Sequence, residues 1–244
     1  MAGAKNGSIW VLGLTGGIAC GKSSASTFLA GLGAHIIDAD RISRAVTAPG
    51  GVALPAIERE FGPAVFSDGV LNRRELGQRV FANDALRRRL EAIIHPLVQQ
   101  QTLNDIRELE ASGAACAVLD VPLLYETGMD VLCDEVWLMA VPPEEQLRRV
   151  MERDGLSEAQ ALSRINSQMP LEQKQALCDR VIWTNHSIQA TQRELEALWQ
   201  LWSKRWKKWK GIQVGCKVTG QVEPQDARGR SRRGAAVRWR ASAN

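Results

Sequence analysis

The sequence predicts an α/β fold in which a parallel β-sheet is covered by helices on both faces. Five short apolar runs rich in strand-forming residues span residues 9–14, 34–38, 115–121, 136–141 and 180–183, and stretches with helical spacing separate them. Strands that alternate with helices are typical of parallel sheets buried on both faces. The composition agrees, because 45% apolar and 24% charged residues are ordinary for a folded chain of 244 residues.

A glycine-rich turn lies between the first apolar run and a helical segment at 22–32. Residues Gly16-Gly17-Ile18-Ala19-Cys20-Gly21-Lys22-Ser23 fit the pattern G-x-x-x-x-G-K-[ST]. Glycines let backbone N–H groups converge on phosphate oxygens, and the helix N-terminus directs its dipole at the same anion. Lys22 reaches the β- and γ-phosphates, and Ser23 can ligate Mg²⁺. We therefore expect a P-loop NTPase three-layer fold that binds a nucleoside triphosphate through residues 16–24, including Ser24.

Two carboxylates, Asp38 and Asp40, stand at the end of the second predicted strand. Ligands of open α/β sheets bind beyond the carboxyl ends of the strands, so both residues face the phosphate loop. One carboxylate can position or deprotonate an acceptor hydroxyl, and one can help to hold Mg²⁺ through water. The alternative is a helix N-cap, which suits Asp38 better, and we favour Asp40 as the catalytic residue.

The phosphate loop alone does not separate a kinase from a GTPase, a motor or a helicase. The sequence has no N-K-x-D guanine motif and no apolar run that ends in Asp-Glu, and Leu119-Asp120 is the nearest to a Walker B strand end. The short chain, the carboxylate pair after the second strand and an Arg-rich late helix favour a kinase that acts on a small molecule.

Two stretches interrupt the alternation of strands and helices. Residues 50–101 contain no good strand and show helix-like segments at 53–61, 73–81 and 85–94, which predicts a helical insertion. Residues 143–178 are also helical in pattern and rich in Arg and Gln. We interpret this second stretch as helices over the sheet edge that form a mobile lid.

Several segments resemble the dephospho-CoA kinase family in order and spacing. They are residues 14–18, 38–44, 94–98, 120–126, 146–149 with 153–154, 167–168 and 184–185. The resemblance covers about residues 8–203. It implies a nucleotide-binding core, a helical acceptor-binding insertion at about 50–101 and a lid at about 143–178. It also implies that Mg²⁺-ATP phosphorylates the 3′-hydroxyl of the ribose of dephospho-CoA, the final step of coenzyme A biosynthesis.

The resemblance also implies roles for single residues. Asp40 would be the general base, and Arg149 would come from the lid to neutralise charge on the transferring phosphoryl group. Lys22 would complete the catalytic set, and Asn185 would lie near the adenine of ATP. The acceptor site would include Asp38, Arg44, His95 and Pro96.

The residues taken alone leave other interpretations open. Arg148 and Arg149 are more often a solvated helix face, although a planar guanidinium suits phosphate oxygens. His95 before Pro96 is more often a helix-end residue. Shikimate kinase is the nearest alternative kinase, because it too has a carboxylate pair after the second strand, but the long insertion argues against it. Ala19-Cys20 stands where the family often has Gly-Ser, and the thiol prompts the hypothesis of sensitivity to oxidation.

Residues 204–244 form a basic tail with 12 Lys or Arg and 2 acidic residues. The low apolar content from about 211 predicts disorder. Just before it, four tryptophans at 199, 202, 206 and 209 would form one stripe on a helix. A nucleotide-dependent nucleic-acid-binding protein, or contact with an anionic membrane, is the alternative use of this tail. We favour a final helix that packs its tryptophans on the core, with no nucleic acid or membrane partner.

The five cysteines are odd in number and form no C-x-x-C pair, which indicates free thiols in a reducing compartment. The first eight residues show no apolar signal core, and no apolar run approaches the length of a membrane span. We therefore expect a cytoplasmic enzyme that is a monomer or a weak oligomer.

Overall fold

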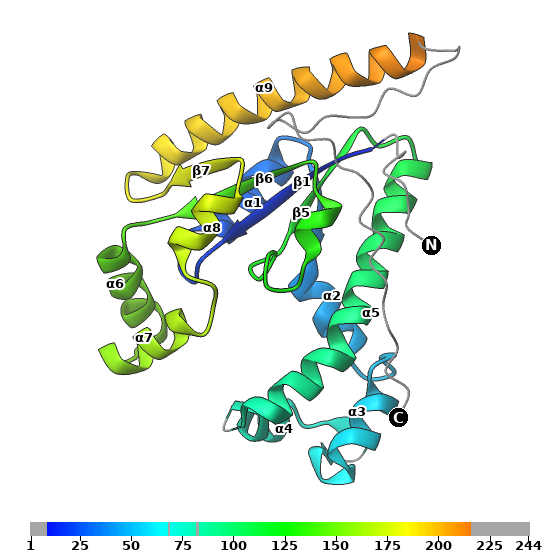
Figure 1. Cartoon of the computed structure of the whole chain (residues 1–244), viewed down its shortest axis with the longest axis vertical. Helices are drawn as coiled ribbons and strands as arrows, with labels where there is room; N and C mark the ends of the chain where they lie inside the picture. The colour runs from blue at the N-terminus through cyan, green and yellow to red at the C-terminus, as the bar shows by residue number, and fades with distance from the viewer. Residues whose placement is uncertain (1–8, 68, 82, 216–244) are drawn as a thin grey trace.

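The computed structural model describes residues 9–67, 69–81 and 83–215, and its centre is a five-stranded parallel sheet (Figure 1). The strand order is β2-β5-β1-β6-β7. The strands are β1 (Trp10–Gly16), β2 (His35–Asp38), β5 (Cys116–Asp120), β6 (Glu135–Ala140) and β7 (Arg180–Trp183). All five predicted strands form, each close to its expected bounds, and the predicted α/β fold is confirmed.

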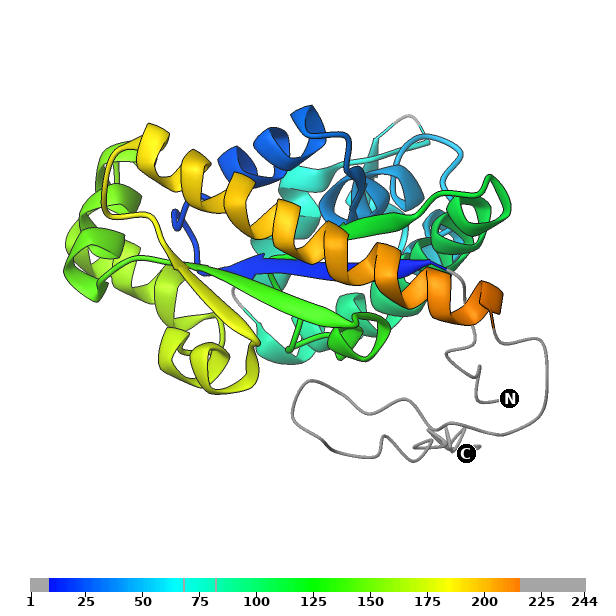
Figure 2. The same cartoon turned by 90° about the horizontal axis from the view of Figure 1, so that it is seen from above.

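Alternate residues of the central strands point into two separate apolar layers. Leu12 and Leu14 of β1 face a cluster that contains Leu29 of α1 (Lys22–Gly31) and Trp199 of α9 (Ile188–Gly215). Val11 of the same strand faces the opposite cluster, which includes residues of α2 (Ala39–Val46) and α5 (Asp84–Ala111). Helix α9 lies across the first of these faces (Figure 2). The sheet is therefore buried on both sides, as the continuous apolar runs predicted.

Two tryptophans of α9 are packed on the sheet. Trp199 and Trp202 are buried and stacked with ring centroids 5.1 Å apart, and Trp202 meets Trp10 edge to face at 6.3 Å. The expected packing of a tryptophan-bearing helix on the core is thus confirmed for these two residues. The helix continues to Gly215, past the boundary at 204 where the tail was predicted to begin. The side chains of 206 and 209 and all of 216–244 lie outside the described residues.

The stretch after α2 forms a lobe of its own beside the sheet (Figure 1). It contains α3 (Leu54–Phe61), the 3₁₀ turn η1 (Pro63–Val65), α4 (Arg73–Phe81) and the first part of α5. The expectation of no strand here was wrong, since β3 (Phe66–Ser67) and β4 (Val70–Leu71) form a small antiparallel hairpin. Two-residue strands are too short to produce a visible alternation of apolar and polar residues.

Helix α5 passes through Pro96 and continues to Ala111, although the sequence predicted its end at 94. The proline lacks an N–H and so removes one backbone hydrogen bond within the helix. Pro96 itself is exposed, while Val98 and Thr102 in the next turns are buried. Packing of these later turns outweighs the loss of one bond, and the interpretation of His95 as a helix-end residue was therefore wrong.

The stretch between β6 and β7 is helical, as predicted. It contains α6 (Pro143–Asp154), α7 (Glu158–Asn166) and α8 (Leu171–Leu177), and the turn η2 (Met129–Leu132) precedes β6. Ser157 begins α7 with a capping box, in which its side chain and that of Gln160 each accept a backbone N–H at the helix start. None of the helices in the described part of the chain has the length and apolar character needed to span a membrane.

A buried ion pair joins α8 to the loop after β5. Lys174 of α8 is fully buried; its ammonium donates to the carbonyl of Pro122 at 2.9 Å and forms an ion pair with Glu126 Oε1 at 2.9 Å. Glu126 also accepts from the backbone N–H of Met169 at 2.9 Å. The pair is asymmetric, because the glutamate side chain keeps 23% of its surface exposed and the lysine keeps none.

We expect Glu126→Gln to lower the free energy of unfolding by about 3 kcal/mol, because it leaves a buried ammonium without a counter-charge. Lys174→Met should cost less, since water can still reach the remaining carboxylate and the carbonyl of Pro122 still accepts from Thr15. Urea denaturation of both variants and of the double variant measures the difference. A Lys174→Met variant at least as unstable as Glu126→Gln would contradict this account.

Candidate active site

A cavity of about 760 Å³ opens at the carboxyl end of the sheet. It brings together residues from the glycine-rich loop, the start of α1, α2, the loop after β5, α6 and the segment between α7 and α8. The lining residues are Gly17, Ile18, Ala19, Cys20, Gly21, Lys22, Ser23, Ser24, Asp40, Pro122, Arg149, Glu152, Arg153 and Gln168. The loop and the two predicted catalytic residues outside it, Asp40 and Arg149, therefore line one cavity.

The loop conformation depends on positions where side chains have no room. Gly16 ends β1, and Gly21 has a φ of 82°, in the left-handed region that favours glycine. A Cβ on Gly17 would lie 2.6 Å from Nε2 of Gln146. Ala19 also has a positive φ, of 59°, at the position where glycine was expected by resemblance. The alanine therefore carries conformational strain that glycine would avoid, on the order of 1–2 kcal/mol.

Cys20 is a buried residue of the loop, with only 1% of its surface exposed. Its thiol lies 3.7 Å from the carbonyl of Ile18, and burial raises the pKa of the thiol to about 11. The group therefore stays protonated at neutral pH, and buried neutral thiols react slowly with oxidants. This environment argues against the hypothesis that Cys20 makes the protein sensitive to oxidation.

The loop lysine is paired with an acidic residue at the end of β5. Strand register places Asp120 opposite both Leu14 of β1 and Asp38 of β2. Asp120 is 5% exposed and forms an ion pair with Lys22. The sequence had indicated Asp120 only as a Walker B-like strand end and had not placed it in the site. Its contact with Lys22 depends on the strand order, which the sequence did not show.

The two carboxylates after β2 have different surroundings. The Asp38 side chain accepts from the backbone N–H of Arg41 at 3.0 Å and caps helix α2, as the alternative interpretation held. Asp40 lies in the first turn of α2, exposed on the cavity wall. Partial loss of hydration raises the pKa of its carboxyl group, the ammonium of Lys22 opposes this, and the negative charges of Asp38 and Asp120 add to the rise.

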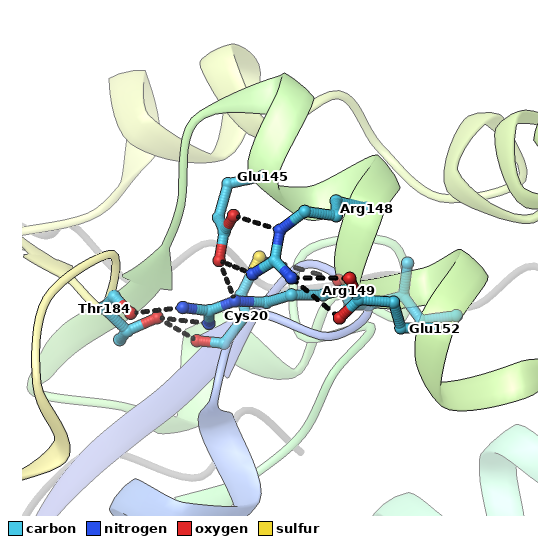
Figure 3. Close-up of polar contacts among 7 residues, drawn as sticks. Cys20, Glu145, Arg148, Arg149, Glu152 and Thr184 are labelled. Carbon is cyan, nitrogen blue, oxygen red and sulfur yellow. Dashed lines mark hydrogen bonds and ion pairs between the residues drawn. The ribbon is translucent and has the colours of Figure 1, made fainter.

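Arg149 of α6 reaches from the helix to the end of β7 (Figure 3). It donates from Nε to Glu145 at 2.6 Å, and its two terminal nitrogens donate to the hydroxyl and the carbonyl of Thr184 at 3.2 and 2.7 Å. Arg148 instead binds Glu145 and Glu152 on the helix surface, where its side chain is 55% exposed. The solvated-face interpretation is thus right for Arg148 and wrong for Arg149.

Glu145 joins both arginines. Its hydrogen bonds with Arg148 and Arg149 lower the pKa of the Glu145 carboxyl to about 2. The residue is therefore ionised throughout the neutral range. It holds the Arg149 guanidinium through Nε from the side of its own helix, while the two terminal nitrogens bind Thr184.

Two glutamines hold the phosphate loop at Ile18. Gln146 of α6 donates to the Ile18 carbonyl at 3.0 Å, and Gln168 accepts from the Ile18 N–H at 3.1 Å. Gln146 is 5% exposed, so it is a buried polar side chain with a specific partner. Both glutamines lie in segments that resemble the family. No local pattern indicated their contact with the loop, which joins residues 128 and 150 positions apart.

The remaining predicted residues lie outside the cavity lining. Asn185 is exposed beside Thr184, and Arg44 is exposed near the end of α2. His95 is half-buried and Pro96 exposed in the middle of α5. Helices α2 and α5 pack against each other, which places the segments bearing these residues in neighbouring helices of the lobe.

Comparison with known proteins settles which family these features belong to. The family model described as dephospho-CoA kinase matches residues 10–190. The chain belongs to the dephospho-CoA kinase family. The resemblance found in the sequence motifs is thereby confirmed.

Relatives and solved structures agree with this assignment. The dephospho-CoA kinase of Carboxydothermus hydrogenoformans is 45% identical over 200 residues, which cover 82% of this chain and 96% of that protein. A Thermus thermophilus structure is 33% identical, with a TM-score of 0.67, and covers 79% of this chain and 97% of its own. The dephospho-CoA kinase of Campylobacter jejuni is 29% identical, with a TM-score of 0.63. The match covers 80% of this chain and 97% of that protein. The kinase thus has the fold of its family over its sheet and surrounding helices.

Proposed function

We propose that Asp40, Lys22 and Arg149 carry the reaction of this kinase. The family establishes the reaction itself, in which ATP phosphorylates dephospho-CoA and gives coenzyme A in the last step of its synthesis. The single observation that supports the assignment is the convergence of these three residues with the glycine-rich loop in one cavity. The proposed acceptor is the 3′-hydroxyl of the ribose.

In this proposal Asp40 is the general base. The carboxylate takes the proton of the 3′-hydroxyl while the 3′-oxygen forms a bond to the γ-phosphorus, and the bond from that phosphorus to the β,γ-bridging oxygen breaks. ADP leaves with the electron pair of that bond. A raised pKa makes the carboxylate of Asp40 a better proton acceptor, as long as it remains ionised at the working pH.

Positive charge around the phosphates is the second part of the proposal. Loop N–H groups and the N-terminus of α1 would hold the β- and γ-phosphates, with the Lys22 ammonium beside them. Arg149 lines the same cavity, and each of its terminal nitrogens keeps one N–H that Thr184 does not use and that can donate to an oxygen of the transferring phosphoryl group. These groups would stabilise the negative charge that spreads over the phosphoryl oxygens in the transition state.

The donor set fits Mg²⁺. Ser23 is exposed and lines the cavity, and the carboxylate of Asp120 forms an ion pair with Lys22, which lines the same cavity. Hydroxyl and carboxylate oxygens are ligands that Mg²⁺ prefers, usually with several waters retained. We assign Ser23 as a direct ligand, with Asp120 and Asp38 acting through water. When bound, the ion would neutralise part of the negative charge of the phosphates.

We further propose that the α2–α5 lobe binds dephospho-CoA and that α6–α8 form a lid. Arg44, His95 and Pro96 would contact the acceptor together with Asp38, and Asn185 would lie by the adenine of ATP. The packing of α2 on α5 supports a shared acceptor surface. Cys20 and Cys116 are free thiols, which supports the proposed reducing, cytoplasmic setting.

The pH dependence should report the ionisation of Asp40. A general base must be ionised, so kcat/KM is lost as the pH falls through the raised pKa of this carboxyl. Asp38→Asn removes one negative charge that raises this pKa, and asparagine still caps α2. We expect the acid limb of the profile to move to lower pH in this variant. An unmoved limb, or a shift to higher pH, would exclude Asp40 as the titrating group.

The substrate assignment is tested by incubating the protein with Mg²⁺-ATP and one of three acceptor classes: dephospho-CoA, shikimate or a nucleoside monophosphate. We expect ADP with dephospho-CoA and little with the others. The product is located by its mass and by whether a 3′-phosphate is present. Absence of ADP formation with dephospho-CoA refutes the assignment.

A further inference from the structure

We infer that Thr184 is a positioning residue, whose hydroxyl holds Arg149 against the phosphate loop. The inference rests on the role proposed above for Arg149 and adds a residue that the sequence motifs did not assign. Thr184 directly follows β7 and is 7% exposed. Its backbone N–H donates to the carbonyl of Ala140 at 2.9 Å, so the sheet fixes its position.

The hydroxyl of Thr184 bridges the loop and the arginine (Figure 3). It donates to the carbonyl of Cys20 at 3.1 Å and accepts from a terminal nitrogen of Arg149 at 3.2 Å. A hydroxyl has one donor and two acceptor positions, so it can serve both partners at once. The site is buried, and a side chain without a hydroxyl would leave a loop carbonyl and a guanidinium nitrogen without this partner.

Thr184 ties Arg149 to another part of the fold through its backbone carbonyl and its hydroxyl, and of these two groups it is the hydroxyl that also binds the loop. The Glu145 carboxylate lies four residues before the arginine on the same helix, so it fixes the guanidinium only relative to α6. Thr184 belongs to the end of β7 and also lies against the loop, where a Cβ on Gly21 would approach its hydroxyl to 3.3 Å. The guanidinium is therefore aligned with the loop through Thr184.

Two substitutions of Thr184 separate the effect of its hydroxyl from the effect of its side-chain shape. Thr184→Val keeps the shape and removes the hydroxyl, whereas Thr184→Ser keeps the hydroxyl and removes the methyl group. We expect Thr184→Val to lower kcat roughly tenfold, the effect of one hydrogen bond to a charged group. KM for dephospho-CoA should change by less than about threefold, because the hydrogen bond from Arg149 to the Thr184 hydroxyl acts on the arginine and not on the acceptor. Thr184→Ser should recover most of the lost kcat.

A double-mutant cycle with Arg149→Lys tests whether the hydroxyl acts through the arginine. Lysine keeps the charge but cannot form the same forked contacts. If Thr184 acts through Arg149, Thr184→Val should produce little further loss of kcat in the Arg149→Lys background. Melting temperatures of all variants, measured alongside, show the folded fraction at the assay temperature.

The outcomes separate the two proposals. Full kcat in Arg149→Lys overturns the role of Arg149 itself. A low kcat in Arg149→Lys with unchanged kcat in Thr184→Val overturns the positioning role alone. Additive losses in the double variant, or a Thr184→Val loss explained by a smaller folded fraction, also overturn it. Independence in the cycle would mean that the hydroxyl acts on the loop without the arginine.

Discussion

We expect Asp40→Asn to lower kcat for dephospho-CoA phosphorylation by about 10²- to 10⁴-fold, the usual contribution of a general base. Asparagine keeps the size of the side chain but cannot take the proton of the acceptor hydroxyl. The residue lies on the cavity wall and is not the cap of α2, so the fold should be unaffected. Steady-state assays with saturating ATP, together with ATP titration by calorimetry, separate lost chemistry from lost binding.

The matched control is Asp84→Asn, the same chemical change at the start of α5, where the side chain is 70% exposed and lies outside the cavity. It should keep kcat within about twofold, as surface substitutions usually do. An Asp40→Asn enzyme with more than a tenth of the wild-type kcat would show that another group accepts the proton, or that no general base is needed.

The second large effect is expected for Lys22→Ala, with kcat reduced by about 10²- to 10³-fold. The substitution removes a positive charge from the place where the β- and γ-phosphates are proposed to bind. It also leaves the carboxylate of Asp120, 5% exposed, without its ion-pair partner. Assays at saturating Mg²⁺-ATP measure the change in kcat, and a melting curve shows whether the unpaired carboxylate has also reduced stability.

The double variant Lys22→Ala/Asp120→Asn removes the unpaired carboxylate. It should be more stable than Lys22→Ala but have no higher turnover, because the positive charge of the Lys22 ammonium beside the phosphates is still missing. Return of kcat to within tenfold of the wild-type value in the double variant would mean that the effect of Lys22 is structural.

The strands and the phosphate loop could be predicted because their signals are local. Each strand contains a short run of apolar residues, and the loop is a fixed spacing of glycines, lysine and serine that closes within eight residues. The helix through Pro96 and the hairpin β3–β4 were missed for a related reason. Tertiary packing outweighed a helix-breaking residue in the first case, and the strands were too short to show a period in the second.

The rest of the site could not be predicted because it depends on contacts between distant segments. Asp120 meets Lys22 across 98 positions, and Thr184 meets Cys20 across 164. These contacts depend on the strand order, in which β1 lies between β5, which bears Asp120, and β6, the neighbour of β7. The capping role of Asp38 was anticipated, because a cap is expected immediately before a helix.

The hold on Ile18 has a consequence for the energetics of nucleotide binding. Gln146 and Gln168 bind the carbonyl and the N–H of the same residue from two different segments. The loop conformation in which Ile18 makes both hydrogen bonds is therefore coupled to the position of the two segments that carry the glutamines. Any free energy that stabilises this loop conformation stabilises that position of the segments by the same amount. A nucleotide that binds this loop conformation more tightly thus also favours the position of α6 and of the segment with Gln168 that contacts the loop, and the reverse holds equally.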